Sequence, residues 1–225
     1  MALLLAAALF TAWLAFGLHR NEVNWGSWWT NAIDGWVRWF ARWYHRLDGD
    51  RIELPEQGGV LLASNHLSGL DPFLLIAMCN RPLRFLIAEE EYNRFGLRWL
   101  FRAAGCIPVD RGGRTDAAFR SAVRALRNGE VIALFPHGRI YLDDQQESRV
   151  KPGVLRLAQL SRCPIVPVRL QGVKGVGTVV SSVFLRSQAN VKVMPTIDAE
   201  ITEHHDMRQQ LGELLLGRRL EISLK

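Results

Sequence analysis

The pattern of hydrophobic and polar positions changes twice along the chain. Residues 2–18 form an uncharged run of 17 residues, close to the lower limit of about 17–25 for a helix that crosses a bilayer. We predict a membrane anchor here. A cleaved signal peptide is the alternative, although only the terminal amine stands where such a peptide normally carries a basic region. His19 and Arg20 follow, which predicts that the rest of the chain lies at the cytoplasmic face of the inner membrane.

A tryptophan-rich segment follows at residues 24–47, with six of the chain's eight tryptophans. Its apolar residues recur at three- and four-residue steps, which predicts an amphipathic helix. Arg38, Arg42 and Arg46 form a second stripe. Tryptophan gathers at headgroup level and basic faces favour anionic lipids, so we predict an interfacial helix in contact with membrane phospholipids. The alternative is a helix packed on the domain, with its tryptophans in the core.

From residue 51 onward, short apolar runs alternate with amphipathic stretches. Strands are predicted at residues 51–54, 59–64, 83–88, 106–109, 131–135, 165–170 and 191–194. Helices are predicted at residues 72–79, 95–104, 116–127, 154–161 and near 207–220. This alternation indicates an α/β fold, with a mostly parallel central sheet flanked by helices and preceded by the membrane-associated helices. We expect an N-terminal membrane segment at residues 1–47 and an α/β domain at residues 48–225.

Polar residues cluster directly after the predicted strands, where parallel sheets open their ligand crevice. In "SNHLSGLD", His66 follows a strand by two residues and Asp71 precedes Pro72. Taken singly, Asp71 has the alternative role of a helix cap, and His66 that of bonding a loop carbonyl. Together they allow a turn that brings the carboxylate to one imidazole nitrogen and leaves the other as a base. No G-x-S-x-G motif supplies a nucleophile, so the hydroxyl would come from a substrate.

The amino-acid composition limits the classes of binding partner that the chain could have. The net charge is +6, and 24 of the 28 basic residues are arginine, whose planar fork of donors suits phosphate. This balance fits anionic lipid, phosphorylated substrates or nucleic acid. We expect no nucleic-acid partner, because no recognised nucleic-acid motif is present and the basic residues are scattered. The three cysteines are widely separated, which predicts reduced core residues in a cytosolic setting.

Four ordered motifs resemble those of one enzyme family. "NHLSGLD" at residues 65–71 resembles the N-H-x-x-x-x-D signature of the glycerolipid acyltransferases, the family of lysophosphatidic acid acyltransferases. Three further blocks are similar to the family's later motifs: "GCIPVDR" at 105–111, "FPHGRI" at 135–140 and "VPVRLQG" at 166–172, with "KPG" at 151–153. A single H-x-x-x-x-D is common, whereas the ordered set is specific.

The resemblance implies an acyl transfer without a bound cofactor or metal. Acyl-CoA or acyl carrier protein would donate the acyl group to a lysophospholipid acceptor, 1-acylglycerol-3-phosphate, giving phosphatidic acid. His66 would be the general base, supported by Asp71. The implied substrate-binding residues are Asn65, Arg111, Arg114, His137, Gly138, Arg139 and Lys151. Arg111 and Arg114 flank two glycines before a predicted helix, a suitable place for phosphate; a flexible turn is the alternative.

The third block departs from the family pattern. His137 stands where glutamate is usual, and Arg139 follows Gly138 directly where threonine normally intervenes. Because histidine both donates and accepts hydrogen bonds, the acceptor could differ, or His137 and Arg139 could hold phosphate together. Other open alternatives are an intact phospholipid as donor, a thioester hydrolase and an inactive lipid-binding relative. A further alternative joins His66, Asp71 and His137 around a metal.

Overall fold

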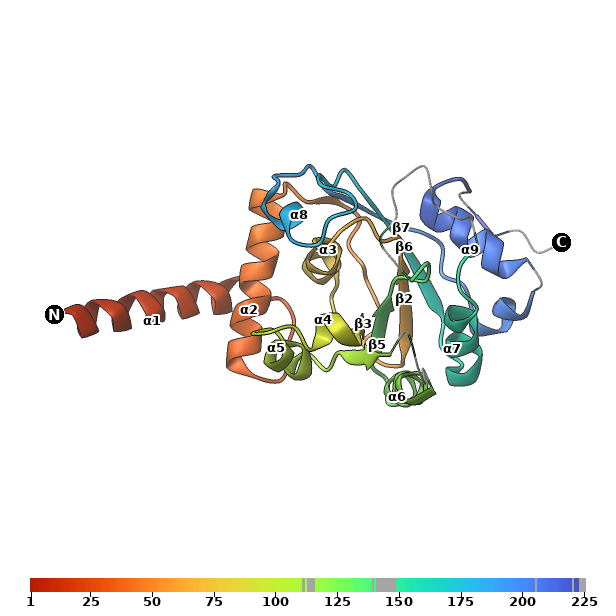
Figure 1. Cartoon of the computed structure of the whole chain (residues 1–225), viewed down its shortest axis with the longest axis horizontal. Coiled ribbons are helices and arrows are strands. Elements are labelled where there is room, and N and C mark those ends of the chain that lie inside the picture. The colour runs from red at the N-terminus through yellow and green to blue at the C-terminus, as the bar shows by residue number, and fades with distance from the viewer. Residues whose placement is uncertain are drawn as a thin grey trace.

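The computed structural model describes residues 1–110, 112, 116–138, 140, 149–204, 206–219 and 221–222. A seven-stranded sheet lies at the centre, in the order β1-β7-β6-β2-β5-β3-β4 (Figure 1). The strands are β1 (Asp48–Gly49), β2 (Val60–Ser64), β3 (Leu83–Ala88), β4 (Ile107–Val109), β5 (Val131–Leu134), β6 (Ile165–Gln171) and β7 (Asn190–Val193). Every neighbouring pair in this order is parallel except β6 and β7. The predicted α/β fold with a mostly parallel sheet is therefore confirmed.

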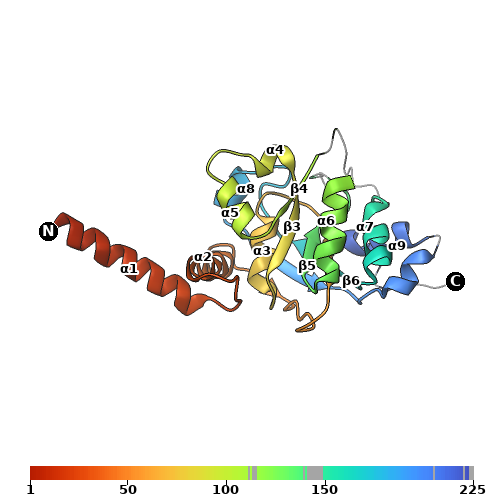
Figure 2. The ribbon, with the colours of Figure 1, turned by 90° about the horizontal axis from the view of Figure 1, so that it is seen from below.

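Helices cover both faces of the sheet, as the continuous apolar runs of its strands require. All residues of β2 and β5 are buried, which is typical of strands covered on both sides. One core cluster includes α3 (Asp71–Met78), and the other includes α6 (Asp116–Arg127), α7 (Gly153–Ser161) and α9 (Met207–Leu216). Figures 1 and 2 show α3 on one face of the sheet and the other three helices on the opposite face.

Two N-terminal helices lie outside α3. Helix α1 (Ala2–Arg20) projects from the body, and α2 (Trp28–Trp39) runs between it and α3 (Figure 1). A short π-helix, η1 (Phe40–Tyr44), extends α2. Helix α1 has a mean hydropathy of 1.9 over its best window and is long and apolar enough to cross a membrane, a test that signal sequences near an N-terminus also pass.

Small residues let α1 and α2 cross closely. A Cβ atom added to Gly35 would lie 1.8 Å from the carbonyl oxygen of Gly17. Around this crossing, the Trp36 ring stacks on Trp13 at 5.9 Å between centroids and lies 4.5 Å from Phe16. Part of the tryptophan-rich face therefore packs against α1, while Trp28 and Trp43 are each 58% exposed. None of the segment's six tryptophans is buried in the core of the domain, which the packed-helix alternative expected.

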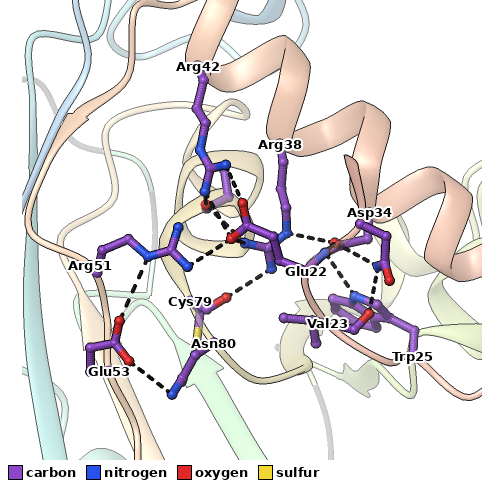
Figure 3. Close-up of polar contacts among 12 residues, drawn as sticks. Glu22, Val23, Trp25, Asp34, Arg38, Arg42, Arg51, Glu53, Cys79 and Asn80 are labelled. Atoms are coloured by element: carbon purple, nitrogen blue, oxygen red, sulfur yellow. Dashed lines mark hydrogen bonds and ion pairs between the residues drawn. The ribbon is translucent and has the colours of Figure 1, made fainter. Parts of the chain in front are cut away.

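The arginine stripe does not face lipid at Arg38, and this prediction is wrong. Arg38 is 1% exposed and pairs with the buried Asp34 at 2.6 Å. Its other guanidinium nitrogens donate to the carbonyl oxygens of Ala77 and Cys79 at 3.2 and 2.9 Å (Figure 3). The last carbonyls of a helix have no partner within that helix, so a guanidinium stabilises them. Arg38 thus fixes α2 to the carboxyl end of α3.

Glu22, in the α1–α2 connection, joins this network from outside. Its carboxylate accepts hydrogen bonds from Arg38 at 3.0 Å, from Arg51 at 2.8 Å and from Arg42 (Figure 3). The Arg42 hydrogen bond is the main cause that lowers the pKa of Glu22 to about 2, with burial opposing and Arg51 assisting. The predicted division at residues 47 and 48 stays a prediction, and the network binds the two parts together.

The structure differs from several predicted elements. Residues 51–54 do not form a strand of the sheet; the first strand is β1, and Ile52 makes an isolated bridge with Cys79. Its backbone N–H donates to Met78 at the end of α3, so an inward-pointing Ile52 reflects packing on a helix end. The predicted helix at 95–104 is shorter, as α5 (Arg98–Ala103). Three short helices had no clear signal: α4 (Glu89–Tyr92), α8 (Ser181–Phe184) and the 3₁₀-helix η3 (Ala199–Glu203).

Candidate active site

The site forms where β2 ends and α3 begins. Between them, residues 65–70 make a tight turn, which we call the catalytic turn. The fully buried Asp71 carboxylate accepts hydrogen bonds through Oδ2 from Nδ1 of His66 at 2.8 Å and from the backbone N–H groups of Leu67 and Ser68 at 2.6 and 2.9 Å. The Ser68 hydroxyl donates to Oδ1 at 3.2 Å. The turn therefore brings the carboxylate and the imidazole together, as their spacing allows.

Asp71 does not act as the cap of α3. It is the first residue of that helix, and the residue at the N-cap position is Leu70. The carboxylate instead turns back onto the N–H groups of Leu67 and Ser68. Because a buried charge needs hydrogen-bond donors, these two amides and the Ser68 hydroxyl are what allow Asp71 to stay buried beside the imidazole. The sequence did not indicate a role for Ser68.

The imidazole of His66 is held from two directions and remains accessible. Its ring stacks on Phe135 with 3.9 Å between centroids and 10° between planes. Its side chain is 18% exposed, whereas that of Asp71 is not exposed at all. When Nδ1–H donates to the carboxylate, the lone pair of the neutral ring lies on Nε2, the atom that a general base uses. Phe135 was not singled out as a site residue, because an aromatic residue after a strand is ordinarily core.

Asn65 fixes the turn to the neighbouring strand. Its side-chain amide donates to the carbonyl oxygen of Leu170 at 2.9 Å, and its side-chain oxygen accepts from the N–H of Leu170 at 2.7 Å. This two-way pairing continues the ladder between β2 and β6. The predicted contact between Asn65 and substrate stays a prediction, and the observed bonds give the residue a positioning role.

The third block lies beside the catalytic turn. Ala63 of β2 is paired with Leu134 of β5, so the chain leaves both strands at the same edge of the sheet. Gly138 has a φ of +83°, and a Cβ atom there would lie 2.4 Å from Nζ of Lys151. The N–H of Lys151 donates to the carbonyl oxygen of Pro136 at 3.0 Å. The positive φ therefore favours glycine at this position, and the Lys151 side chain passes close to it.

His137 belongs to the same turn and is 5% exposed. With Gly138 and Lys151, it forms a group next to Phe135, which contacts His66. Three predicted substrate-binding residues thus come together at the carboxyl edge of the sheet. Arg111, Arg114 and Arg139 lie outside the described residues, so their predicted role in binding phosphate stays a prediction.

Metal and thiol chemistry find no support in the described part of the chain. It contains no group of three or more His, Cys, Asp or Glu side chains that could hold a metal ion, and this part includes His66, Asp71 and His137. All three cysteines are free and buried, as predicted for core residues. Burial raises the pKa of the thiols of Cys79 and Cys106 to about 11, which leaves them protonated and poorly nucleophilic near neutral pH.

Comparisons with known proteins agree with this architecture. The crystal structure of the 1-acyl-sn-glycerophosphate acyltransferase PlsC from Thermotoga maritima superposes with a TM-score of 0.60, covering 93% of this chain and 86% of that one. At 18% sequence identity, this likeness shows the shared fold alone.

Each of three sequence relatives matches about half of the chain. A 1-acyl-sn-glycerol-3-phosphate acyltransferase of Bacillus subtilis is 23% identical over 124 residues, 55% of this chain and 61% of that protein. A probable enzyme of the same name from Mycoplasma genitalium is 35% identical over 52% of this chain and 45% of its own length. An N-acylphosphatidylethanolamine synthase of Arabidopsis thaliana is 29% identical over 49% of this chain and 42% of its own length.

The alignments thus cover between 42% and 61% of the length of these three relatives. A model of the Acyltransferase family matches residues 49–171. That stretch runs from β1 to the end of β6 and includes the catalytic turn and the third block. The match covers more than half of the chain and contains the buried carboxylate and imidazole described above, so this chain belongs to the Acyltransferase family.

Proposed function

We propose that this protein is a membrane-bound O-acyltransferase that moves a fatty acyl group from a thioester donor to the hydroxyl of a lysophospholipid. The proposed acceptor is 1-acylglycerol-3-phosphate, and the product is phosphatidic acid. The donor is acyl-CoA or acyl carrier protein. Two of the sequence relatives carry the name of this activity, and the family match includes the residues that would perform it.

One observation carries the proposal: Nδ1 of His66 lies 2.8 Å from the buried carboxylate of Asp71, while its ring remains 18% exposed. A carboxylate in this position holds the imidazole in one tautomer and stabilises the imidazolium that forms on proton abstraction. The ring cannot turn freely, because it also stacks on Phe135. These contacts orient the imidazole of His66 and do not involve Nε2, the atom that would accept the proton.

The reaction can be written with residues of this site. Nε2 of His66 takes the proton of the acceptor hydroxyl as the oxygen attacks the thioester carbonyl. A C–O bond forms, and the tetrahedral intermediate collapses with cleavage of the C–S bond. The thiolate leaves and receives the proton from the imidazolium, so the base is regenerated. General-base assistance of this kind contributes about 10²–10⁴ in rate, and no acyl-enzyme is formed.

The proposed location is the cytoplasmic face of the membrane. Helix α1 supplies an apolar segment of suitable length, and Arg20 and Arg46 provide positive charge on the side of the body. Both proposed thioester donors are cytoplasmic molecules. A base near the carboxyl edge of the sheet would then meet a lipid hydroxyl from the bilayer and a thioester from solution.

A second acceptor class is favoured by two observations together. His137 replaces the glutamate that is usual in the third block, and one relative is named for N-acylation of phosphatidylethanolamine. An amine can replace the hydroxyl in the same mechanism, because His66 would again remove one proton from the attacking group. Phosphatidylethanolamine therefore belongs beside 1-acylglycerol-3-phosphate in any acceptor panel.

The test compares the full-length protein with its His66→Ala variant in vesicles that contain labelled acyl-CoA and one acceptor at a time. We expect turnover of 1-acylglycerol-3-phosphate to fall about 10²–10⁴-fold, because the general base is removed. His204→Ala is the matched control, since that exposed histidine follows η3, far from the site in sequence. Near-normal turnover by His66→Ala would refute the mechanism.

The same assay separates the other reaction classes. A thioester hydrolase releases free fatty acid when no acceptor is present, whereas the proposed enzyme requires an acceptor. An inactive lipid-binding relative shows no acyl transfer to any member of the panel. Adding unlabelled intact phospholipid tests it as a donor, because competition would dilute the label in the product.

A further inference from the structure

The exposed apolar side chains of the body are gathered on one side. Among the described residues beyond α1, ten large apolar side chains are strongly exposed. Nine of them occur in three segments: Trp28 and Trp43; Phe95, Leu97 and Trp99; and Val179, Val180, Phe184 and Leu185. The tenth is Leu160, on α7. Single exposed apolar residues are ordinary on a protein surface, whereas such a concentration marks an interaction surface.

The three segments are neighbours in space. The rings of Trp29 in α2 and Trp99 in α5 lie 5.3 Å apart. On the other side of α2, the Tyr44 hydroxyl of η1 donates to the carbonyl oxygen of Phe184 in α8 at 2.6 Å. The Arg186 guanidinium lies 6.0 Å from the Trp43 ring centroid. Figures 1 and 2 show α5 and α8 beside α2, on the side of the body from which α1 projects. We call this surface, residues 28–46, 93–104 and 173–189, the docking face.

The charges of the docking face favour an anionic partner. Within these ranges the exposed charged side chains are all basic: Arg46, Arg94, Arg98, Arg102, Lys174 and Arg186. The exposed Glu89, Glu90 and Glu91 lie at its border, where Glu91 pairs with Arg94 at 3.0 Å. Its one acidic residue, Asp34, is buried. Aromatic rings mixed with arginine and lysine are typical of protein surfaces that rest on anionic headgroups. A second copy of the chain would bring like charges together, which opposes self-association.

The docking face is joined directly to the catalytic turn. The N–H of Gly69 donates to the carbonyl oxygen of Thr178 at 3.0 Å, and the N–H of Gly177 donates to that of Leu67 at 2.9 Å. A Cβ atom on Gly69 would lie 2.1 Å from the carbonyl oxygen of Val179. Only glycine permits this approach, so the backbone that carries Val179 and Val180 lies against the turn that carries His66.

We infer that the body itself touches the bilayer, through residues 179–185 and 95–99, in addition to the N-terminal helices. Val180, Phe184 and Phe95 enter the headgroup region while the basic side chains contact anionic phosphates. Because residues 177 and 178 are bonded to the catalytic turn, this contact sets the turn at the membrane surface. The last step rests on the proposed function, whereas the lipid contact does not.

The lipid contact is tested with an environment-sensitive NBD dye attached to single introduced cysteines in the full-length protein. Phe184→Cys and Phe95→Cys report on the docking face, and Leu160→Cys is the matched control on α7. The native cysteines are all buried, so labelling falls on the new thiol. On addition of vesicles of phosphatidylglycerol and phosphatidylethanolamine, we expect a blue shift and a severalfold rise in emission at 184 and 95, and little change at 160.

Two results would overturn the inference. In the first, the dye at 184 responds to vesicles no more than the dye at 160. In the second, the emission at 184 shifts with protein concentration in detergent solution without vesicles, which would show that the face joins two copies of the chain. Neither readout requires acyl transfer, so the lipid contact and the proposed activity can fail independently.

The effect on catalysis is tested with the double variant Val180→Ser and Phe184→Ser, and with Leu160→Ser as its control. We expect the KM for acceptor in vesicles to rise about tenfold, because two apolar side chains that would be partly buried in the bilayer are replaced by polar ones. The KM for a water-soluble short-chain acceptor should change much less. An equal rise with both acceptors would show that these side chains do not act through the bilayer.

Discussion

Two buried aspartates have different roles in this molecule. Asp71 at the start of α3 holds His66, and Asp34 in α2 holds Arg38. His66 is partly exposed, as the proposed general base must be to meet a substrate. Arg38 is permanently charged and 1% exposed, and its donors are used on Asp34, Glu22 and the end of α3. The same carboxylate chemistry therefore gives the proposed reactive pair in one place and a structural clamp in the other.

The surroundings of the two pairs differ in the same way. The catalytic turn lies on a sheet whose apolar side chains point inward. At the N-terminal helices the arrangement is partly inverted, because charged groups are buried against α3 while much of α1 is apolar and exposed. The proposed insertion of α1 in lipid would account for this contrast, because exposure of apolar side chains is unfavourable in water and favourable in a bilayer.

Asparagine at the two positions gives the strongest test of this contrast. Asp71→Asn should lower kcat about 10²–10⁴-fold, because an amide cannot stabilise the imidazolium as a carboxylate does. Asp34→Asn should leave the turnover of folded protein unchanged and lower its thermal stability. Both are measured on purified protein, by acyl transfer to vesicle-borne acceptor and by thermal unfolding. If Asp34→Asn impairs turnover as strongly as Asp71→Asn, the two pairs do not have separate roles.

The second-largest effect is expected when Arg38, the arginine of this clamp, is replaced. Arg38→Met should lower the free energy of unfolding by about 3–5 kcal/mol, because it leaves the buried Asp34 carboxylate without its cation. Arg42→Met is the matched control: the Arg42 side chain is 36% exposed, and exposed ion pairs contribute about 0–1 kcal/mol. Denaturant unfolding in detergent measures both. Equal losses would mean that burial of Arg38 is not what makes its pair important.

The smallest expected effect concerns His45, at the junction of the two regions. This residue is fully buried, and its Nε2 lies 3.2 Å from the carbonyl oxygen of Val183 in α8. Burial lowers the pKa of His45 below its ordinary value of 6.5, with the Val183 hydrogen bond opposing. The unfolded chain therefore binds the proton more readily, and stability is lost as the pH falls below about 6.5 towards the folded-state pKa.

Thermal unfolding between pH 7.5 and 5.5 checks the direction of this pH dependence. The fall in melting temperature over that range should be smaller for His45→Gln than for the unaltered protein, because glutamine keeps a donor for Val183 and does not titrate. The other histidines are the same in both proteins, so the difference isolates His45. An identical fall in the two proteins would show that its protonation is not linked to folding.

Local patterns predicted the elements whose partners are close in sequence. The buried strand β2, the Gly- and Ser-rich turn and the proline-led helix α3 all follow from short-range signals. His66 and Asp71 meet because only a short turn separates them. The sequence pattern of residues 51–54 was misleading, since an inward-pointing Ile52 packs equally well on a sheet or on the end of a helix.

Local patterns could not predict contacts between residues that are far apart in the sequence. The stacking of Phe135 on His66 requires the parallel register of β2 and β5. The direction of Arg38 was wrongly predicted because a helical stripe shows that a polar face exists, and not which groups it meets. Its partners, the unpaired carbonyls at the end of α3, exist only once that helix has formed.

The sequence by itself thus determined the α/β class, the reactive pair and the apolar N-terminal helix, because these depend on periodicity and on spacing within a few residues. Only the tertiary structure decided which arginines are buried, which aromatic ring supports the base and which segments surround α2. Those features arise where segments far apart in the chain meet, and no local pattern specifies the meeting.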